Sequence, residues 1–311
     1  MSKPRIAVTL GDPAGIGPEI VRRAVNSLKV QRVCSPVVFG DSQSFKKYFK
    51  NVKNCELVES YRTKKIIKAG VPSKEGGEAA LAAVEKAVAG CLSEKAGLKA
   101  LATAPVSKES LKLAGSKWPA HTEMLACLTE SGKVAMMMVC GKICAVMATR
   151  HLPVKKVPEN IKAKDIAETV MLACEFLRKR TGKRMIKTVV CGLNPHAGDN
   201  GIIGKEEKKE IIPACLMLRR AGICVQGPFA ADCAWMKIKN GEYDLICGMY
   251  HDQIMIPLKC IDAKKIVNVT AGLPFVRTSP GHGTAFDIAG GGKASPDAMI
   301  EAVVYAAESR P

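Results

Sequence analysis

The sequence predicts an α/β fold in which much of the sheet is parallel. Short apolar runs alternate with longer amphipathic stretches along the whole chain, as strands and helices alternate in such folds. The 311 residues suffice for two domains, and 47% hydrophobic residues provide for a buried core. Because no repeat, low-complexity segment or Ser/Gly-rich linker interrupts the sequence, we expect the two domains to be interwoven.

The expected strands are apolar runs of four to seven residues, several of them rich in Val and Ile. They are residues 5–10, 37–40, 100–104, 142–148, 188–191, 245–249 and 266–270. The expected helices are longer, and the third of them places Ile166, Val170 and Leu177 on one face. The helices are predicted at residues 17–28, 74–92, 164–180 and 205–220.

The chain is strongly basic, with 47 Lys and Arg against 29 Asp and Glu, a formal net charge of +18. Clustered basic residues bind nucleic acids and anionic membranes. Here the basic pairs are scattered, and several lie in helix-like stretches that also contain Glu. We therefore expect neither a nucleic acid nor a membrane as partner, and anionic small-molecule substrates or solvated lysines account for the charge. A non-catalytic basic binding protein stays open as the alternative from another class.

The 13 cysteines indicate a reducing compartment. Their number is odd, they form no CxxC pair, and many lie within apolar runs, where a free Cys behaves as a small hydrophobe. The apolar run at residues 6–10 is too short for a signal peptide or a membrane helix. The expectation is a cytoplasmic protein.

Three of the five histidines share one sequence context. His151, His196 and His251 each lie just after an apolar strand-like run. In parallel sheets the ligand site lies beyond the carboxyl ends of the strands, so these imidazoles are expected at one edge. Three neutral imidazoles suit a divalent metal that keeps open positions for substrate. Asp252 follows His251 directly and could orient a ligating ring or transfer a proton.

Two Gly- and Pro-rich segments are also candidate site loops. Residues 11–19 follow the first strand and open a helix, so their backbone N–H groups could face an anion or a cofactor. The segment fits neither the GxGxxG fingerprint nor a P-loop, which removes support for those nucleotide folds. Residues 272–292 form a long non-periodic stretch that includes Arg277 and His282, and such stretches are more often functional than structural.

Taken together, seven motifs closely resemble those of the 4-hydroxythreonine-4-phosphate dehydrogenase family of pyridoxal phosphate biosynthesis, which includes dehydrogenases of related four-carbon sugar-acid phosphates. They follow the family's order and spacing over residues 11–290, nearly the whole chain. The motifs are GDPAGIGPE, PAHTE, TRHLP, GLNPHAGDNGIIG, GPFAAD, YHDQ and GLPFVRTSPGHGTAFDIAG.

The resemblance implies an isocitrate/isopropylmalate dehydrogenase-like fold, with two α/β domains and an active-site cleft between them. It also implies a homodimer with shared active sites. One domain would be discontinuous, comprising residues 1–118 and 262–311 on the nucleotide-cofactor side. The other, residues 119–261, would contain the metal histidines and the dimer interface.

The resemblance also assigns roles to individual residues. The three metal ligands of the family match His151, His196 and His251. Its substrate-binding positions match His121, Thr122, Lys259, Asn268 and Arg277. By analogy with the wider fold, the cofactor would contact Gly11, Asp12, His282, Gly283 and Thr284. Lys259 and Arg277 would provide fixed positive charge for a phosphate or carboxylate.

The implied reaction uses NAD or NADP and a divalent metal, which could be zinc, magnesium or cobalt. It oxidises 4-phosphohydroxy-L-threonine to a β-keto acid, which decarboxylates to 3-amino-2-oxopropyl phosphate. Asp252 is the nearest candidate for the general base, and a lysine is the other. Arg150, Gly281 and the Ser279-Pro280 pair differ from the residues common in the family. These differences keep D-erythronate 4-phosphate and D-threonate 4-phosphate open as alternative substrates.

Overall fold

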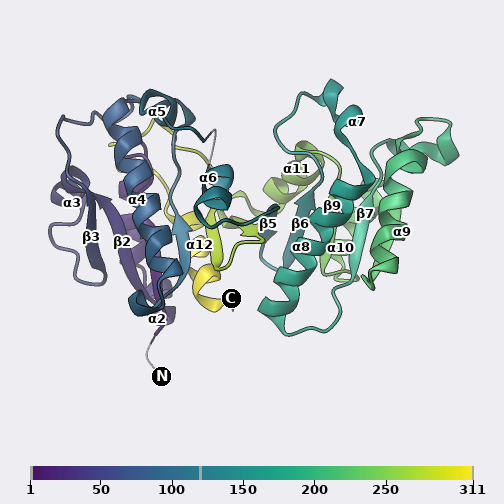
Figure 1. The fold of residues 1–311 in the computed structure, drawn as a ribbon, viewed down its shortest axis with the longest axis horizontal. Coiled ribbons are helices and arrows are strands. Elements are labelled where there is room, and N and C mark those ends of the chain that lie inside the picture. The colour runs from purple at the N-terminus through teal and green to yellow at the C-terminus, as the bar shows by residue number, and fades with distance from the viewer. Residues whose placement is uncertain (1–2, 119–120, 310–311) are drawn as a thin grey trace. The chain divides into compact units, whose positions relative to one another are not determined.

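The computed structural model describes residues 3–118 and 121–309 and divides into two compact units (Figure 1). Unit 1 comprises Met1–Lys133 and Val267–Pro311, so both ends of the chain belong to it. Unit 2 is Val134–Ile266. Residues 119 and 120 are among those outside the described part. The predicted domain boundary between residues 118 and 119 therefore lies at the edge of the described part, and Pro119 and Ala120 of the PAHTE motif lie outside it.

Unit 1 is built on a sheet with the strand order β3-β2-β1-β4-β11-β10. All neighbouring strands are parallel except β10, which is antiparallel to β11. In the register of the central strands, Val8 lies opposite Val38 and Ala102. Central strands of this kind are continuous apolar runs because helices cover both faces. The strands are β1 Arg5–Thr9, β2 Ser35–Asp41, β3 Glu56–Tyr61, β4 Leu98–Thr103, β10 Ile266–Ala271 and β11 Val276–Pro280.

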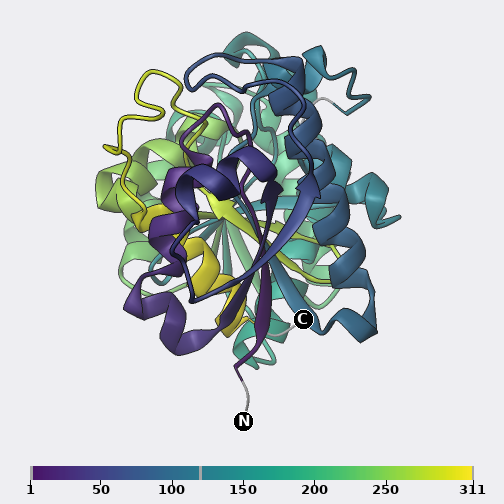
Figure 2. The same ribbon diagram turned by 90° about the vertical axis from the view of Figure 1, so that its left-hand side faces the viewer.

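The helices of unit 1 pack on opposite faces of this sheet. In Figure 2 its purple strands run between the blue helix α4 and the yellow helix α12. Helix α4 begins after Ser73, whose hydroxyl accepts the Gly76 N–H at 3.0 Å, and it buries its Ala- and Val-rich face. The helices are α1 Gly17–Val25, α2 Leu28–Val33, α3 Ser42–Tyr48, α4 Lys74–Leu92, η1 Glu94–Ala96, α5 Lys108–Leu113, α6 His121–Leu128 and α12 Asp297–Glu308.

Unit 2 has its own sheet with the strand order β5-β6-β9-β7-β8. Strands β5 and β6 form an antiparallel hairpin, and the remaining neighbours are parallel. Because β6, β9 and β7 are adjacent and parallel, the segments that follow them start at the same edge of the sheet. The strands are β5 Ala135–Cys140, β6 Ile143–Met147, β7 Thr188–Cys191, β8 Val225–Phe229 and β9 Leu245–Gly248.

The core of unit 2 lies between this sheet and its helices. Val189 and Ile246 from the sheet pack in one buried cluster with Ala234 of α10 and Leu258 of α11. The α-helices are α7 Val157–Asn160, α8 Ala163–Thr181, α9 Ile212–Arg220, α10 Ala231–Lys239 and α11 His251–Asp262. The short helices are η2 Val154–Lys156, η3 Pro195–Gly201, the π-helical turn η4 Glu207–Ile211 and η5 Ala263–Lys265.

The predicted α/β fold is confirmed, and every predicted strand is present. Sequence patterning missed β3, β5, β8 and β11. Strand β8 contains Gly227 and Pro228, and β11 contains Arg277 and Pro280, residues that are rare in strands. The predicted helix 205–220 is divided, because a π-helical turn occupies its first part before α9 begins.

Two further observations concern the whole described chain. No helix within residues 3–118 and 121–309 is both long and apolar enough to cross a membrane. All thirteen cysteines are free thiols, and seven of them are buried. Burial raises the pKa of several of these thiols, for example that of Cys191 to about 12, so they remain protonated and pack as apolar side chains.

Candidate functional site

A buried arginine is the most unusual group in unit 1. Arg277 lies on β11, and only 2% of its surface is exposed. Its Nη1 donates to the Thr270 hydroxyl at 3.1 Å, and its Nη2 donates to the Thr103 hydroxyl at 2.7 Å. Burial lowers the pKa of Arg277 to about 10, which still leaves the guanidinium charged at neutral pH. Within the described residues no carboxylate pairs with it.

His121 lies beside this guanidinium. It begins helix α6, and its Nδ1 accepts from Arg277 Nη2 at 3.4 Å. Burial, and secondly the charge of Arg277, lower the pKa of His121 to about 3, so its ring is neutral at physiological pH. The structure therefore brings together a fixed cation and a neutral imidazole, two of the predicted substrate-binding residues.

Among the described residues, several polar atoms of this pair and of the neighbouring strands are buried without a hydrogen-bond partner. They include Arg277 Nε, His121 Nε2, Asn268 Oδ1 and Thr9 Oγ1. Buried polar atoms are nearly always paired, and a bound ligand is one way to satisfy the exceptions. We name Arg277, His121 and the partners Thr103 and Thr270 the arginine cluster. An arrangement of donors around one buried positive charge suits an anionic group of a substrate.

The remaining predicted substrate residues are placed differently. Thr122 follows His121 in the first turn of α6 and is half-buried. Asn268 is on β10, where its backbone pairs with that of Ser279 on β11. Lys259 is exposed on helix α11 of unit 2. Thus four of the five predicted residues belong to unit 1, and Lys259 belongs to unit 2.

Within unit 1, the loop after β1 contacts the segment with the predicted cofactor residues 282–284. The Ile16 N–H donates to the Thr284 carbonyl at 3.0 Å, and Gly15 lies so close that a Cβ there would be 2.9 Å from the same oxygen. Gly11 has φ +70°, and a Cβ on it would lie 2.2 Å from the Pro105 carbonyl oxygen. The structure therefore joins two of the predicted cofactor segments.

Asp12 is a buried carboxyl group in this loop. Its Oδ1 accepts the Ala14 N–H at 2.9 Å, while its Oδ2 has no hydrogen-bond partner. Burial raises the pKa of this carboxyl group. His282 is exposed, with its Nδ1 donating to the Gly283 carbonyl at 3.0 Å. These backbone-rich turns with one orphaned carboxylate oxygen suit polar groups of a cofactor.

The loop that follows residues 282–284 is held at Gly290 and Gly292 by Glu19, a residue that the sequence analysis did not predict. Glu19 is buried at 6% exposure, and its carboxylate accepts the N–H groups of Gly290 at 2.5 Å and Gly292 at 3.1 Å. It reaches across 271 positions of sequence, so no local spacing announces the contact. The consequence is that both ends of segment 284–290 are fixed to the first helix and its preceding loop.

In unit 2, two of the three predicted metal ligands lie side by side. His151 follows β6, His251 begins α11 after β9, and their ring centroids are 5.7 Å apart. His251 Nδ1 donates to Asp252 Oδ1 at 2.7 Å. This hydrogen bond directs the Nε2 of His251 away from the carboxylate. Ligating histidines commonly donate their other ring nitrogen to a carboxylate in this way.

His196 is presented by a strained loop after β7. Residues 196–200 all have φ between 43° and 80°, the left-handed region, although only Gly198 is a glycine. The loop is fixed by Glu207, which is 3% exposed and begins the π-helical turn. Glu207 Oε1 accepts the N–H groups of Leu193 and Asn194, each at 2.8 Å. Its Oε2 accepts from Asn194 Nδ2 at 2.9 Å.

Glu207 was not predicted, because a glutamate in a charged helix-like stretch reads as a solvated residue. Here it is a buried carboxylate that determines how the His196 loop leaves the sheet. A π-helical turn at this position is a local distortion of the kind often found near functional sites.

The imidazole and carboxylate side chains of this part of unit 2 are of the types that bind divalent metals. Two imidazoles have neighbouring rings, a carboxylate orients one of them, and the third imidazole follows the adjacent parallel strand. The described residues contain no group of three or more His, Cys, Asp or Glu side chains arranged to hold one ion. The structure thus brings His151 and His251 together and leaves His196 outside that pair.

Comparisons with known proteins agree with the motifs. Residues 26–306 match the family described as pyridoxal phosphate biosynthetic protein PdxA. A 4-hydroxythreonine-4-phosphate dehydrogenase of Sulfurihydrogenibium sp. (strain YO3AOP1) is 38% identical, over 97% of this chain and 97% of that protein. A D-threonate 4-phosphate dehydrogenase of Pectobacterium atrosepticum is 37% identical, over 97% of this chain and 98% of that protein.

A solved structure shows the same similarity. The crystal structure of a 4-hydroxythreonine-4-phosphate dehydrogenase from Burkholderia phymatum matches with a TM-score of 0.85 at 34% sequence identity. The match covers 100% of both chains. The resemblance inferred from the seven motifs is confirmed, and the chain belongs to the PdxA family of dehydrogenases.

Proposed function

We propose that the chain is a metal-dependent, NAD(P)-linked dehydrogenase of 4-phosphohydroxy-L-threonine in pyridoxal phosphate biosynthesis. It oxidises the hydroxyl group β to the carboxylate. The resulting β-keto acid loses CO2 and becomes 3-amino-2-oxopropyl phosphate. The observation that favours this proposal is Arg277, a buried cation with no carboxylate partner in the described residues. A buried charge left uncompensated in the protein is costly, so an anionic substrate is its natural partner.

The substrate contacts follow from the arginine cluster. Arg277 binds an anionic group, with Nε, which has no protein partner, available as a further donor. His121 stays neutral beside it because burial and the neighbouring charge lower its pKa to about 3, so it offers Nε2 for a hydrogen bond. Asn268 and Thr122 add neutral polar contacts, and Lys259 supplies the second positive charge that a substrate with both a carboxylate and a phosphate requires.

The proposed metal ligands are His151, His196 and His251. A divalent cation, whether zinc, magnesium or cobalt, supplies Lewis-acid chemistry at substrate oxygens when bound. Asp252 orients His251 through the 2.7 Å hydrogen bond. Its side chain is 57% exposed, so the carboxylate can also accept a proton from the substrate hydroxyl.

The proposed cofactor site uses the two joined loops of unit 1. Backbone groups of Gly11, Gly283 and Thr284 and the side chains of Asp12 and His282 contact NAD or NADP. Support comes from the Ile16 to Thr284 hydrogen bond and the unpartnered Oδ2 of Asp12. We further propose a cytoplasmic homodimer with shared active sites, in which residues 119–261 provide the interface. The free thiols support a reducing compartment.

The test is reduction of NAD and of NADP by the purified, metal-loaded protein, followed by absorbance of the reduced nicotinamide. The substrates are 4-phosphohydroxy-L-threonine, D-threonate 4-phosphate and D-erythronate 4-phosphate. We expect the highest kcat/KM with the amino acid phosphate. A higher value with D-threonate 4-phosphate would favour the second candidate, which the 37% identical Pectobacterium relative motivates. Protein that holds metal but reduces neither cofactor with any of the three would be the non-catalytic binding protein instead.

A further inference from the structure

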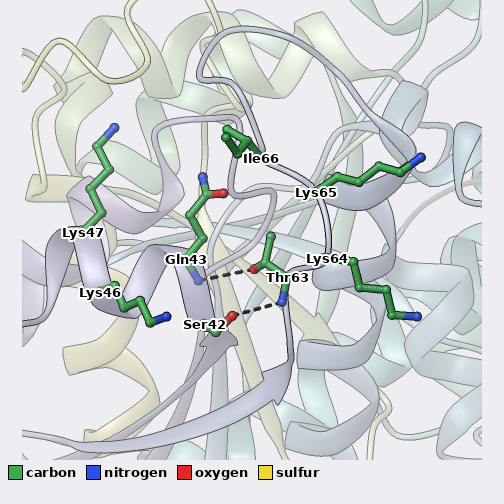
Figure 3. Close-up of a pocket in the computed structure, with 8 residues that line it drawn as sticks. All are labelled: Ser42, Gln43, Lys46, Lys47, Thr63, Lys64, Lys65 and Ile66. Carbon is green, nitrogen blue, oxygen red and sulfur yellow. Dashed lines mark hydrogen bonds between the residues drawn. The ribbon is translucent and has the colours of Figure 1, made fainter.

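A basic cavity of unit 1 is unrelated to the residues assigned above. Its volume is about 430 Å³, and it lies between residues 42–47 and 63–66 (Figure 3). Neither the loop after β1 nor residues 282–284 contribute to its lining. The cavity therefore differs from the arginine cluster and from the proposed cofactor loops.

Four lysines line this cavity, and no acidic side chain does. Lys46 and Lys47 come from helix α3, and Lys64 and Lys65 come from the opposite segment. Within the part of the chain that the structure describes, none of the four ammonium groups forms an ion pair. Lys47 lies over the Tyr48 ring, with Nζ 4.9 Å from the centroid. Glu75 interacts electrostatically with Lys64, which leaves a net excess of positive charge among the four lysines, and such an excess raises the local potential and attracts anions.

The two walls of the cavity are fixed to each other by hydrogen bonds. The Ser42 hydroxyl accepts the Thr63 N–H at 3.0 Å, and Thr63 Oγ1 accepts the Gln43 N–H at 3.3 Å (Figure 3). The Gln43 side chain donates to the Ile67 carbonyl at 2.8 Å and accepts the Ile67 N–H at 3.0 Å. The lysines therefore project from backbone that is held in place before any ligand arrives, which lowers the entropy lost on binding.

Two carboxylates adjoin the walls of the cavity, those of Asp41 and Glu75, and both accept hydrogen bonds from the wall residues. Asp41 is buried, and its Oδ1 accepts the Ser44 N–H at 2.8 Å and the Thr63 hydroxyl at 3.1 Å. Glu75 accepts the backbone N–H groups of Lys64 at 2.5 Å and Lys65 at 3.2 Å. Both carboxylates thus support the backbone of the walls, and Glu75 also interacts electrostatically with Lys64, so Lys46, Lys47 and Lys65 are the least compensated charges of the cavity.

We propose that this cavity binds the phosphate chain of a polyphosphate. In Figure 3 Lys46 extends toward the opposite wall, whereas Lys64 and Lys65 extend away from helix α3, so the four ammonium groups do not converge on one point. A single phosphate cannot reach all four ammonium groups, whereas a chain of phosphates can contact them in turn. The chain could be inorganic or the tail of a nucleoside triphosphate. Ile66 is 91% exposed on the rim and offers an apolar surface that a nucleobase would cover.

The test is isothermal titration calorimetry of the full chain with inorganic tripolyphosphate, ATP and inorganic phosphate at fixed ionic strength. The test variant combines Lys46→Gln and Lys64→Gln, one exposed lysine from each wall. The matched control combines Lys142→Gln and Lys164→Gln, two exposed lysines of unit 2 that change the net charge equally. We expect the test variant to weaken tripolyphosphate binding at least about tenfold and the control to weaken it less than about twofold.

The ATP arm identifies the source of the phosphate chain. Tighter binding of ATP than of tripolyphosphate, lost again in the test variant, would indicate a nucleotide that uses Ile66. Equal affinity would indicate an inorganic chain.

Four results would overturn the proposal. The first is an equal loss in the test and control variants, which would mean diffuse attraction by the net charge. The second is inorganic phosphate binding as tightly as tripolyphosphate. The third is displacement of bound tripolyphosphate by NADP, which would make the cavity part of the dinucleotide site. The fourth is single-stranded RNA binding more tightly than tripolyphosphate through the same two lysines.

Discussion

The two units present their functional side chains on different kinds of backbone. In unit 1, Arg277, Thr103 and Thr270 lie on three strands of one sheet, so the arginine cluster is fixed by the strand register. In unit 2, His151 and His196 lie on segments after strands, and His251 begins a helix. Strand pairing therefore sets the backbone positions of the arginine cluster, whereas loop and helix-end contacts set those of the imidazoles. We expect the arginine cluster to be rigid and the position of the His196 loop to depend on the contacts of Glu207.

The largest effect is expected at the rigid site. Arg277→Ala should lower kcat/KM for the phosphorylated substrate by at least roughly a hundredfold, because it removes a charged donor from a buried position. Steady-state kinetics with each substrate of the panel provide the measurement. Arg277→Lys, the matched control, keeps the charge but loses the planar guanidinium. Its kcat/KM should lie between that of the parent and that of Arg277→Ala. An Arg277→Ala enzyme with kcat/KM near the parent value would remove the arginine cluster from the site.

Variants of Glu207 test how firmly the His196 loop of unit 2 is held by its hydrogen bonds. Glu207→Ala should lower the free energy of unfolding by about 3 kcal/mol, because three donors lose a buried charged acceptor. Urea denaturation measures this loss. Glu207→Gln keeps one carbonyl acceptor and should lose less. If both variants unfold like the parent, the left-handed loop does not depend on Glu207.

Two glycine variants separate the effect of a steric clash from that of a positive φ angle. Gly11→Ala should destabilise the protein by about 2 kcal/mol more than Gly97→Ala. Both glycines have positive φ, but a Cβ at position 11 meets the Pro105 carbonyl oxygen at 2.2 Å, and one at position 97 meets nothing within 4 Å. Thermal unfolding of the two variants provides the comparison. Equal losses would show that only the φ angle matters.

The smallest expected effect is a pH dependence of stability. The folded-state pKa of His121 is about 3, below the ordinary 6.5, so the unfolded chain binds the extra proton between these values. Stability should therefore fall as the pH decreases below about 6.5. Between pH 7 and pH 5 the parent should lose about 1–2 kcal/mol more than His121→Gln. If the free energy of unfolding of the two proteins changed equally with pH, His121 would not be held neutral in the folded protein.

The sequence predicted most of the continuous apolar strands and missed strands that contain charged residues, Gly or Pro. Strands such as 188–191 are continuous apolar runs because they are buried on both faces, and this pattern needs no tertiary information. Strand β11 contains a charged residue and a proline, and in sequence it reads as part of a loop. The three histidines were found because each follows such an apolar strand. Glu207 and Glu19 were missed because their partners are loop N–H groups that no sequence pattern marks.

By itself the sequence determined the α/β class, the position of His151, His196 and His251 after strands, and the family, because these depend on local periodicity and ordered motifs. Only the tertiary structure decided which charges are functional candidates. Within the part of the chain that the structure describes, Arg277 is buried without a carboxylate partner, and four lysines line one cavity. The physical reason is that desolvation and local charge density depend on which strands and segments become neighbours, and residues distant in sequence determine that.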